Sequence, residues 1–191
     1  MQYLRSKNFV FKDILQPKYY PSGRFPSNPD YALSFMQQVA VNLALNDGND
    51  IRSVNGPPGT GKTTLLKDVF ADLIVQQAAL ICKLRDKEIK GSLIYRDKEK
   101  LGVLPGHISD KGIVVASSNN GAVQNIVNEL PLKEGIAEEF QEKLSEADYF
   151  AAISNLKFPQ KDSENKREIK AERVDNKNWG AFSLEGGAST N

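Results

Sequence analysis

The chain is poor in the residue types that most often build metal sites and nucleophilic catalytic centres. Its 191 residues include a single cysteine, Cys82, and a single histidine, His107. One cysteine cannot form an internal disulfide, and one cysteine with one histidine cannot build a structural zinc site. Nothing in the sequence supports Ser–His or Cys–His catalysis either. We therefore expect neither a structural zinc ion nor a covalent nucleophile.

An excess of charge of either sign is also missing, and so is any long apolar run. The formal net charge is +1, so contact with nucleic acid or a membrane surface would need a local patch. No stretch reaches the roughly 18 apolar residues of a membrane span, and the first residues lack the apolar run of a signal peptide. We expect a cytoplasmic protein with no membrane partner. The composition, 40% hydrophobic and 26% charged, is typical of one ordinary globular domain.

One motif that is present is typical of a phosphate-binding loop. The pattern G-x-x-x-x-G-K-[ST] arises by chance in about one in a hundred chains of this length. Here it follows a short apolar stretch, residues 51–54, and opens an apolar-periodic segment, which is the strand–loop–helix context of a P-loop. The loop reads Gly56-Pro57-Pro58-Gly59-Thr60-Gly61-Lys62-Thr63-Thr64. A plain turn before a helix would explain its glycines and prolines but not the Lys-Thr pair.

The residue types of this loop suit a nucleoside triphosphate with Mg²⁺. Its glycines let several backbone N–H groups converge on phosphate oxygens at the positive end of the following helix. Lys62 is expected to reach the β- and γ-phosphates, and the Thr63 hydroxyl to complete the Mg²⁺ shell. These two residues are the catalytic candidates. Thr64 completes the binding loop, where its side chain is expected to pack or cap.

Periodicity around the loop predicts an α/β fold. Apolar residues recur at helical spacing over 32–44, over about four turns after Thr63, over 123–130 and over 133–156. The β-branched run at 112–116 predicts a second buried strand, beside the strand at 51–54. We therefore expect the parallel sheet of a RecA-like P-loop NTPase, flanked by helices, incomplete, and carrying a charged helical insertion.

Composition divides the chain into three parts. Residues 1–30, rich in proline, are expected to form an extended lead-in. Residues 31–132 are expected to form a partial ATP-binding core. Within it, a charged insertion at about 82–110 is either a solvated face or a surface segment with a hairpin near residues 92–95. Residues 133–191 are helical and charged, as expected for the start of an inserted subdomain.

Three segments, in this order and spacing, resemble superfamily 1 DNA/RNA helicases of the branch (superfamily 1B) that includes the nonsense-mediated-decay helicase. They correspond to the Q motif, motif I and motif Ia: Gln37-Gln38-Val39-Ala40-Val41, Gly56 to Thr63, and Ser118-Asn119-Asn120-Gly121-Ala122-Val123. The resemblance covers about residues 25–130. It implies that Gln37 reads the adenine edge of ATP, since a glutamine amide matches adenine N6 and N7. Gln38 is the neighbouring candidate, and a polar surface position is the alternative.

Motif Ia in that family contacts the nucleic-acid backbone, so the resemblance implies sequence-independent binding of single-stranded DNA or RNA. Here Ser118 stands at the family's proline position and Asn119 at its serine position, whereas Asn120 matches. Short polar side chains at a helix start suit a phosphate, although ordinary helix capping by Ser and Asn would explain them as well.

An apolar strand followed by Asp-Glu, which would hold Mg²⁺ and position the attacking water, is missing from the sequence. We therefore expect an amino-terminal part of a helicase, inactive in hydrolysis without the remainder of the helicase chain. Two alternatives remain open. One is an AAA-type ATPase, which shares the Gly-Pro-Pro-Gly-Thr-Gly-Lys-Thr loop, and the other is a nucleotide- or nucleic-acid-binding module that does not hydrolyse.

Overall fold

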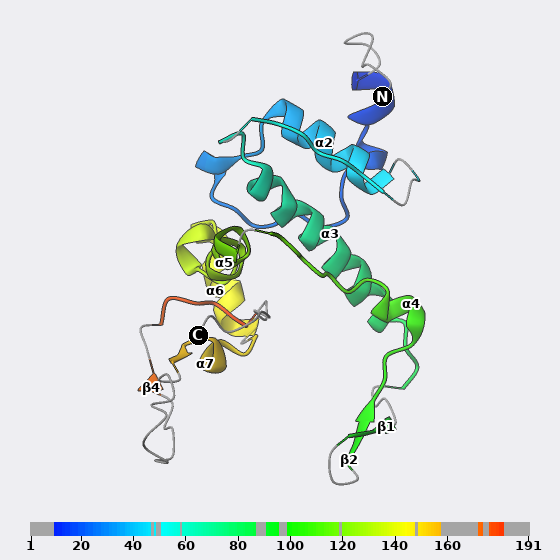
Figure 1. Ribbon diagram of the computed structural model, residues 1–191, viewed down its shortest axis with the longest axis vertical. Helices are drawn as coiled ribbons and strands as arrows, with labels where there is room; N and C mark the ends of the chain where they lie inside the picture. Colours follow the sequence, from blue (N-terminus) through cyan, green and yellow to red (C-terminus); the bar gives the residue numbers. More distant parts are fainter. Residues whose placement is uncertain are drawn as a thin grey trace. The chain divides into compact units, whose positions relative to one another are not determined.

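The computed structural model describes residues 10–46, 48, 51–57, 59–86, 91–95, 99–118, 120–147, 149–157, 172–173 and 176–181 (Figure 1). They belong to two compact units. The first comprises Met1–Phe25 and Leu33–Val114, and the second comprises Pro26–Ala32 and Val115–Asn191. Each is described by itself. In the described part of the chain, no helix combines the length and the apolar character that crossing a membrane requires.

Two helices, α2 (Phe35–Asn46) and α3 (Lys62–Ile81), lie against each other in the first unit (Figure 1). The π-helical turn η1 (Val10–Ile14) packs on α2, where Ile14 and Val39 are both buried. Beside them the Asn42 side chain, also buried, donates to the Ile14 carbonyl over 2.9 Å. The sequence predicts this helix, although Met36 and Leu43, two of its helically spaced apolar residues, are exposed.

Residues 22–25, which we call the strap, follow the 3₁₀ turn η2 (Pro17–Tyr19) and lie along α3. Gly23 comes so close that a Cβ atom there would collide with the Val75 side chain and lie 2.9 Å from the Ala71 carbonyl oxygen. A side chain at this position would therefore push the strap away from the helix.

The charged stretch after α3 contains a hairpin and one short helix. Strands β1 (Gly91–Tyr95) and β2 (Glu99–Gly102) pair in antiparallel register, so of the two alternatives left open by the sequence the hairpin is the one found. Helix α4 (Gly106–Ser109) then lies against α3 through Ile108, which is completely buried. In the described residues between 82 and 110, α4 is the helix found, so the charged helical insertion expected from the sequence is not seen there.

The second unit is built from short elements. They are η3 (Pro29–Tyr31), α5 (Asn120–Glu129), η4 (Lys133–Gly135), α6 (Glu138–Ala147), α7 (Ala151–Ser154), β3 (Leu156–Lys157) and β4 (Glu172–Arg173). The single helix predicted over 133–156 is wrong. The Ala137 N–H donates to the Pro26 carbonyl instead of to a carbonyl one turn earlier, and Phe150 adopts a left-handed φ of 56° before α7. These two interruptions divide the segment.

The predicted parallel sheet is wrong for the part of the chain described. The strands found there form only two antiparallel pairs, β1 with β2 and β3 with β4. Residues 51–54 and 112–116 are extended but belong to no ladder, and Ile51 and Val114 are 88% and 94% exposed. A β-branched run becomes a buried strand only when neighbouring strands pair with it and cover its faces. Because neither run has such neighbours in the described residues, the RecA-like sheet is not formed.

Candidate functional site

The glycine-rich loop leads directly into the N-terminus of α3, the longest helix of the first unit. Gly59 and Gly61 adopt left-handed backbone conformations, with φ of 78° and 69°, and Gly61 is the N-cap of the helix. Lys62 is the first helical residue, and the helical ladder begins where the Leu65 N–H donates to the Gly61 carbonyl. The first N–H groups of a helix have no intrahelical acceptor, and the helix dipole makes this end positive. The loop therefore has the local geometry of an anion site.

Lys62 turns its ammonium group onto this same loop. Its Nζ donates to the carbonyl oxygens of Gly56 and Pro57 over 2.7 and 2.9 Å. The Thr60 hydroxyl also donates to the Pro57 carbonyl, over 2.8 Å. The Lys62 side chain is exposed, so its charge lies at the surface of the loop.

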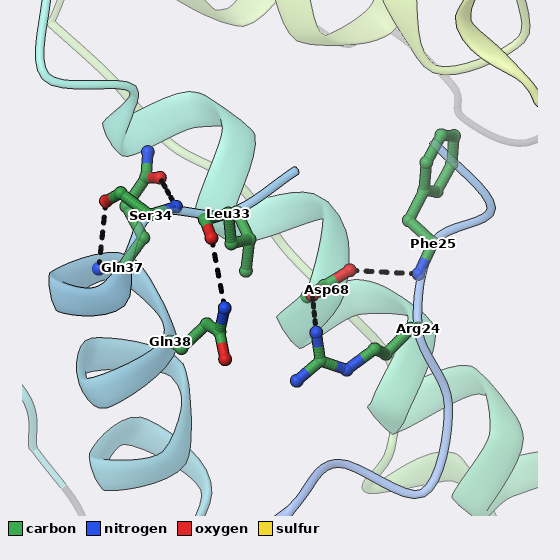
Figure 2. Close-up of polar contacts among 7 residues, drawn as sticks. All are labelled: Arg24, Phe25, Leu33, Ser34, Gln37, Gln38 and Asp68. Atoms are coloured by element: carbon green, nitrogen blue, oxygen red, sulfur yellow. Dashed lines mark hydrogen bonds and ion pairs between the residues drawn. The ribbon is translucent and has the colours of Figure 1, made fainter. Parts of the chain in front are cut away.

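Gln37 sits at the start of α2 in a reciprocal capping box with Ser34 (Figure 2). The Ser34 N–H donates to Gln37 Oε1 over 2.7 Å, and the Gln37 N–H donates to the Ser34 hydroxyl over 3.4 Å. This is the S-x-x-Q form of the box, which satisfies two backbone donors at a helix start. It fixes the direction of the Gln37 side chain.

The amide nitrogen of Gln37 faces the glycine-rich loop. Gln37 Nε2 donates to the carbonyl oxygens of Thr60 and Gly61 over 3.2 and 3.1 Å. The structure thus brings the predicted base-reading residue onto the predicted phosphate loop. Its neighbour Gln38 instead donates to the Leu33 carbonyl over 3.0 Å (Figure 2).

Two buried carboxylates of α3 hold the strap. Asp68 Oδ1 accepts from the Phe25 N–H over 3.0 Å, and Asp72 Oδ1 accepts from the Ser22 N–H over 2.6 Å. Arg24 Nη1 lies 3.9 Å from Asp68 Oδ2 (Figure 2). Burial raises the pKa of Asp68 above its ordinary 3.8, and the Phe25 N–H and the Arg24 charge oppose that rise less strongly. These carboxylates connect the strap to the helix that the glycine-rich loop opens.

The other candidate residues lie at different places. Thr63 is exposed on the first turn of α3, and Thr64 is half-buried beside it. Ser118 is exposed before α5 and Asn120 begins that helix, both in the second unit. Pro58 and Asn119 lie outside the described residues.

A metal ion would find few ligands in this part of the chain. Among the described residues, no three His, Cys, Asp or Glu side chains gather as a metal site would require. Mg²⁺, however, commonly binds through one or two protein groups together with substrate phosphates and water. The exposed Thr63 hydroxyl suits that mode of binding.

Sequence reasoning missed Ser34, Asp68 and Asp72, and of these only Ser34 left a signal in the sequence. Ser34 lies three residues before Gln37, the spacing of a capping box. The two aspartates lie four residues apart on α3, where both are buried in the structure. Only the structure shows this burial, and buried charged residues need partners, which the strap supplies here.

Comparison with known proteins gives one partial similarity. Over 58 residues the chain is 40% identical to the DNA polymerase alpha-associated DNA helicase A of Saccharomyces cerevisiae. The matched part is 29% of this chain and only 8% of that helicase. No protein-family model and no solved structure matches the chain. The similarity relates part of this chain to a DNA helicase.

Proposed function

We propose that this chain is an ATP·Mg²⁺-binding part of a helicase-related protein. The observation that carries the proposal is the G-x-x-x-x-G-K-T loop at the N-terminus of α3, with two left-handed glycines and the Lys62 ammonium at its surface. A helix start, convergent backbone donors and a lysine together suit a triphosphate better than they suit any other common anion. The partial similarity to a DNA helicase supports the choice of nucleotide-driven movement over other P-loop functions.

The side chains of the loop are of the chemical types that bind Mg·ATP. Lys62 would exchange its two loop carbonyls for the β- and γ-phosphates, which are stronger partners because they are charged. The Thr63 hydroxyl would complete the Mg²⁺ shell. The triphosphate supplies a phosphoanhydride bond whose hydrolysis would drive movement in the whole protein.

Hydrolysis by this sequence alone is not proposed. The Asp-Glu pair and the arginine that usually serve phosphoryl transfer have no counterpart in the 191 residues. We assign the chain to the superfamily 1B branch on its Q motif, motif I and motif Ia. In that assignment Gln37, or its neighbour Gln38, lies close to the adenine.

Single-stranded nucleic acid is the proposed partner of the second unit. Ser118 is exposed and Asn120 begins α5, so phosphate oxygens can reach a helix N-terminus there. Contacts of this kind reach only the sugar–phosphate backbone of the nucleic acid, not its bases. Binding should therefore tolerate any base sequence and weaken steeply with salt.

The test is isothermal titration of the 191-residue chain with Mg·ATP. Lys62→Ala should lose at least tenfold in affinity, because it removes the only lysine of the loop. Lys143→Ala, at an exposed position of α6, is the matched control and should bind as the wild type does. Equal affinities of the wild type and Lys62→Ala would contradict the proposal.

Two further measurements separate the alternatives. An AAA-type ATPase would assemble in the presence of ATP, as size-exclusion chromatography would show, and would not bind an oligo-dT strand. A helicase-related chain should bind that strand, with an affinity that falls as salt rises. Tight Mg·ATP binding with no affinity for the strand would favour a stand-alone nucleotide-binding module.

A further inference from the structure

The side-chain amide of Gln37 has almost no hydrogen-bonding capacity left for a base. Its two N–H donors are directed at the carbonyl oxygens of Thr60 and Gly61, and its oxygen accepts from the Ser34 N–H. Reading the N6 and N7 edge of adenine takes one amide N–H and one oxygen lone pair. As placed here, the amide is committed to the glycine-rich loop.

These bonds determine where the loop's own donors point. In a trans peptide unit, the C=O of one residue and the N–H of the next point in opposite directions. Holding the Thr60 and Gly61 carbonyls toward Gln37 therefore turns the N–H groups of Gly61 and Lys62 away from it. N–H groups at this place in a P-loop are the ones that phosphate oxygens meet.

Gly61 and Gln37 also fit each other sterically. A Cβ atom on Gly61 would collide with Gln37 Nε2. The same glycine carbonyl accepts from the Leu65 N–H, so both of its lone pairs are used. The contact between Gln37 of α2 and the loop is thus close and polar.

We propose that Gln37 is a positioning residue of the phosphate loop: its amide holds the Thr60 and Gly61 peptides in the orientation that binds the triphosphate, whatever the base. This rests on the proposed nucleotide binding and assigns Gln37 a role different from adenine reading. The capping box with Ser34 aims the amide, so the start of α2 and the start of α3 form one phosphate-binding unit.

The experiment compares three ligands by isothermal titration: Mg·ATP, Mg·GTP and Mg·tripolyphosphate, the last of which has no base. In Gln37→Ala all three should weaken by a similar factor of about ten, because two amide–carbonyl bonds are lost. Gln37→Glu places a carboxylate against two carbonyl oxygens and should weaken all three further. Gln37→Met, which keeps length without donors, repeats the measurement if the alanine variant does not fold.

Gln141→Ala is the matched control. Gln141 Nε2 also donates to two backbone carbonyls, those of Lys133 and Ile136, but in the second unit. Its loss should lower thermal stability about as much as the loss of Gln37 and leave all three affinities unchanged. Stability without ligand is measured for both variants, so a general structural effect is recognised.

Each outcome decides a different question. A loss confined to Mg·ATP would overturn the proposal in favour of adenine reading, and no loss for any ligand would also overturn it. Failure of the wild type to bind any of the three ligands would instead refute the proposed nucleotide binding. A uniform loss in Gln37→Ala, absent in Gln141→Ala, supports the positioning role.

Discussion

The backbone N–H of Phe25 donates to the carboxylate of Asp68 over 3.0 Å, across 43 residues of sequence. No strand among the described residues pairs with the strap, so its backbone donors need other acceptors. Asp68 supplies one, and Asp72, one helical turn further on, supplies another to Ser22. Side-chain carboxylates of α3 thereby do for the strap what a neighbouring strand does in a sheet.

This relationship predicts a pH dependence of stability. Because burial raises the pKa of Asp68 in the folded chain, the folded state binds more protons than the unfolded state between pH 3.8 and the raised value. The contribution of Asp68 to the free energy of unfolding is then largest below pH 3.8 and falls as the pH rises through that window. Asp68→Asn, which keeps an acceptor for Phe25 but no charge, should remove this contribution.

Thermal unfolding of both proteins from below pH 3.8 to neutral pH measures the effect. The difference between wild type and Asp68→Asn should change with pH, and a constant difference would contradict the prediction. Asp68→Ala serves as a second comparison. It leaves the Phe25 N–H without its acceptor and should cost about 1–3 kcal/mol in the free energy of unfolding.

A second prediction concerns two glycines with similar positive φ angles. Gly48 and Gly61 have φ of 73° and 69°, but a Cβ atom meets nothing within 4 Å at Gly48, whereas at Gly61 it meets the Gln37 amide. Gly48→Ala should cost about 1 kcal/mol for the left-handed backbone alone. Gly61→Ala should cost about 1–3 kcal/mol more, because of the collision.

Urea unfolding of the two variants gives both values. In the double variant Gly61→Ala with Gln37→Ala, the cost of the collision should disappear while the backbone cost stays. If both single variants lower the free energy of unfolding equally, the Gln37 side chain moves aside at no cost in stability, which would contradict the prediction.

A third prediction concerns a buried amide of the second unit. Asn155 donates to the Asn178 carbonyl and accepts from the Asn178 N–H, both over 3.0 Å. Asn155→Ala removes a buried side chain and leaves the N–H and carbonyl of the half-buried Asn178 without these partners, so it should cost about 2–3 kcal/mol. Ser145→Ala, at an exposed position of α6, is the control and should change stability by less than about 0.5 kcal/mol.

Fluorescence of Trp179 follows this unfolding directly. It is the only tryptophan of the sequence, and its indole N–H donates to the Leu130 carbonyl over 3.0 Å. A midpoint for Asn155→Ala equal to that of Ser145→Ala would mean that the Asn155–Asn178 pair does not hold this unit together.

Helices α2, α3 and α5 were predictable because local spacing of apolar residues is enough to mark one face of a helix. The hairpin of β1 and β2 was one of two alternatives that the sequence left open, and it was accessible to local reasoning because its two strands are close in sequence. The parallel sheet was predicted wrongly from two β-branched runs. A strand depends on neighbours that are distant in sequence, and those neighbours are not visible in the run itself.

The candidate site likewise has a part that the sequence predicts and a part that only the structure shows. The sequence by itself determined the glycine-rich loop, with Lys62 and Thr63 at the start of a helix, because that geometry needs only adjacent residues and glycines free to adopt positive φ. Tertiary structure alone decided that the Gln37 amide faces the Thr60 and Gly61 carbonyls, and that Asp68 and Asp72 hold the strap. Such bonds join segments 23 to 50 residues apart, and their partners become defined only when the folded chain brings these donors and acceptors together.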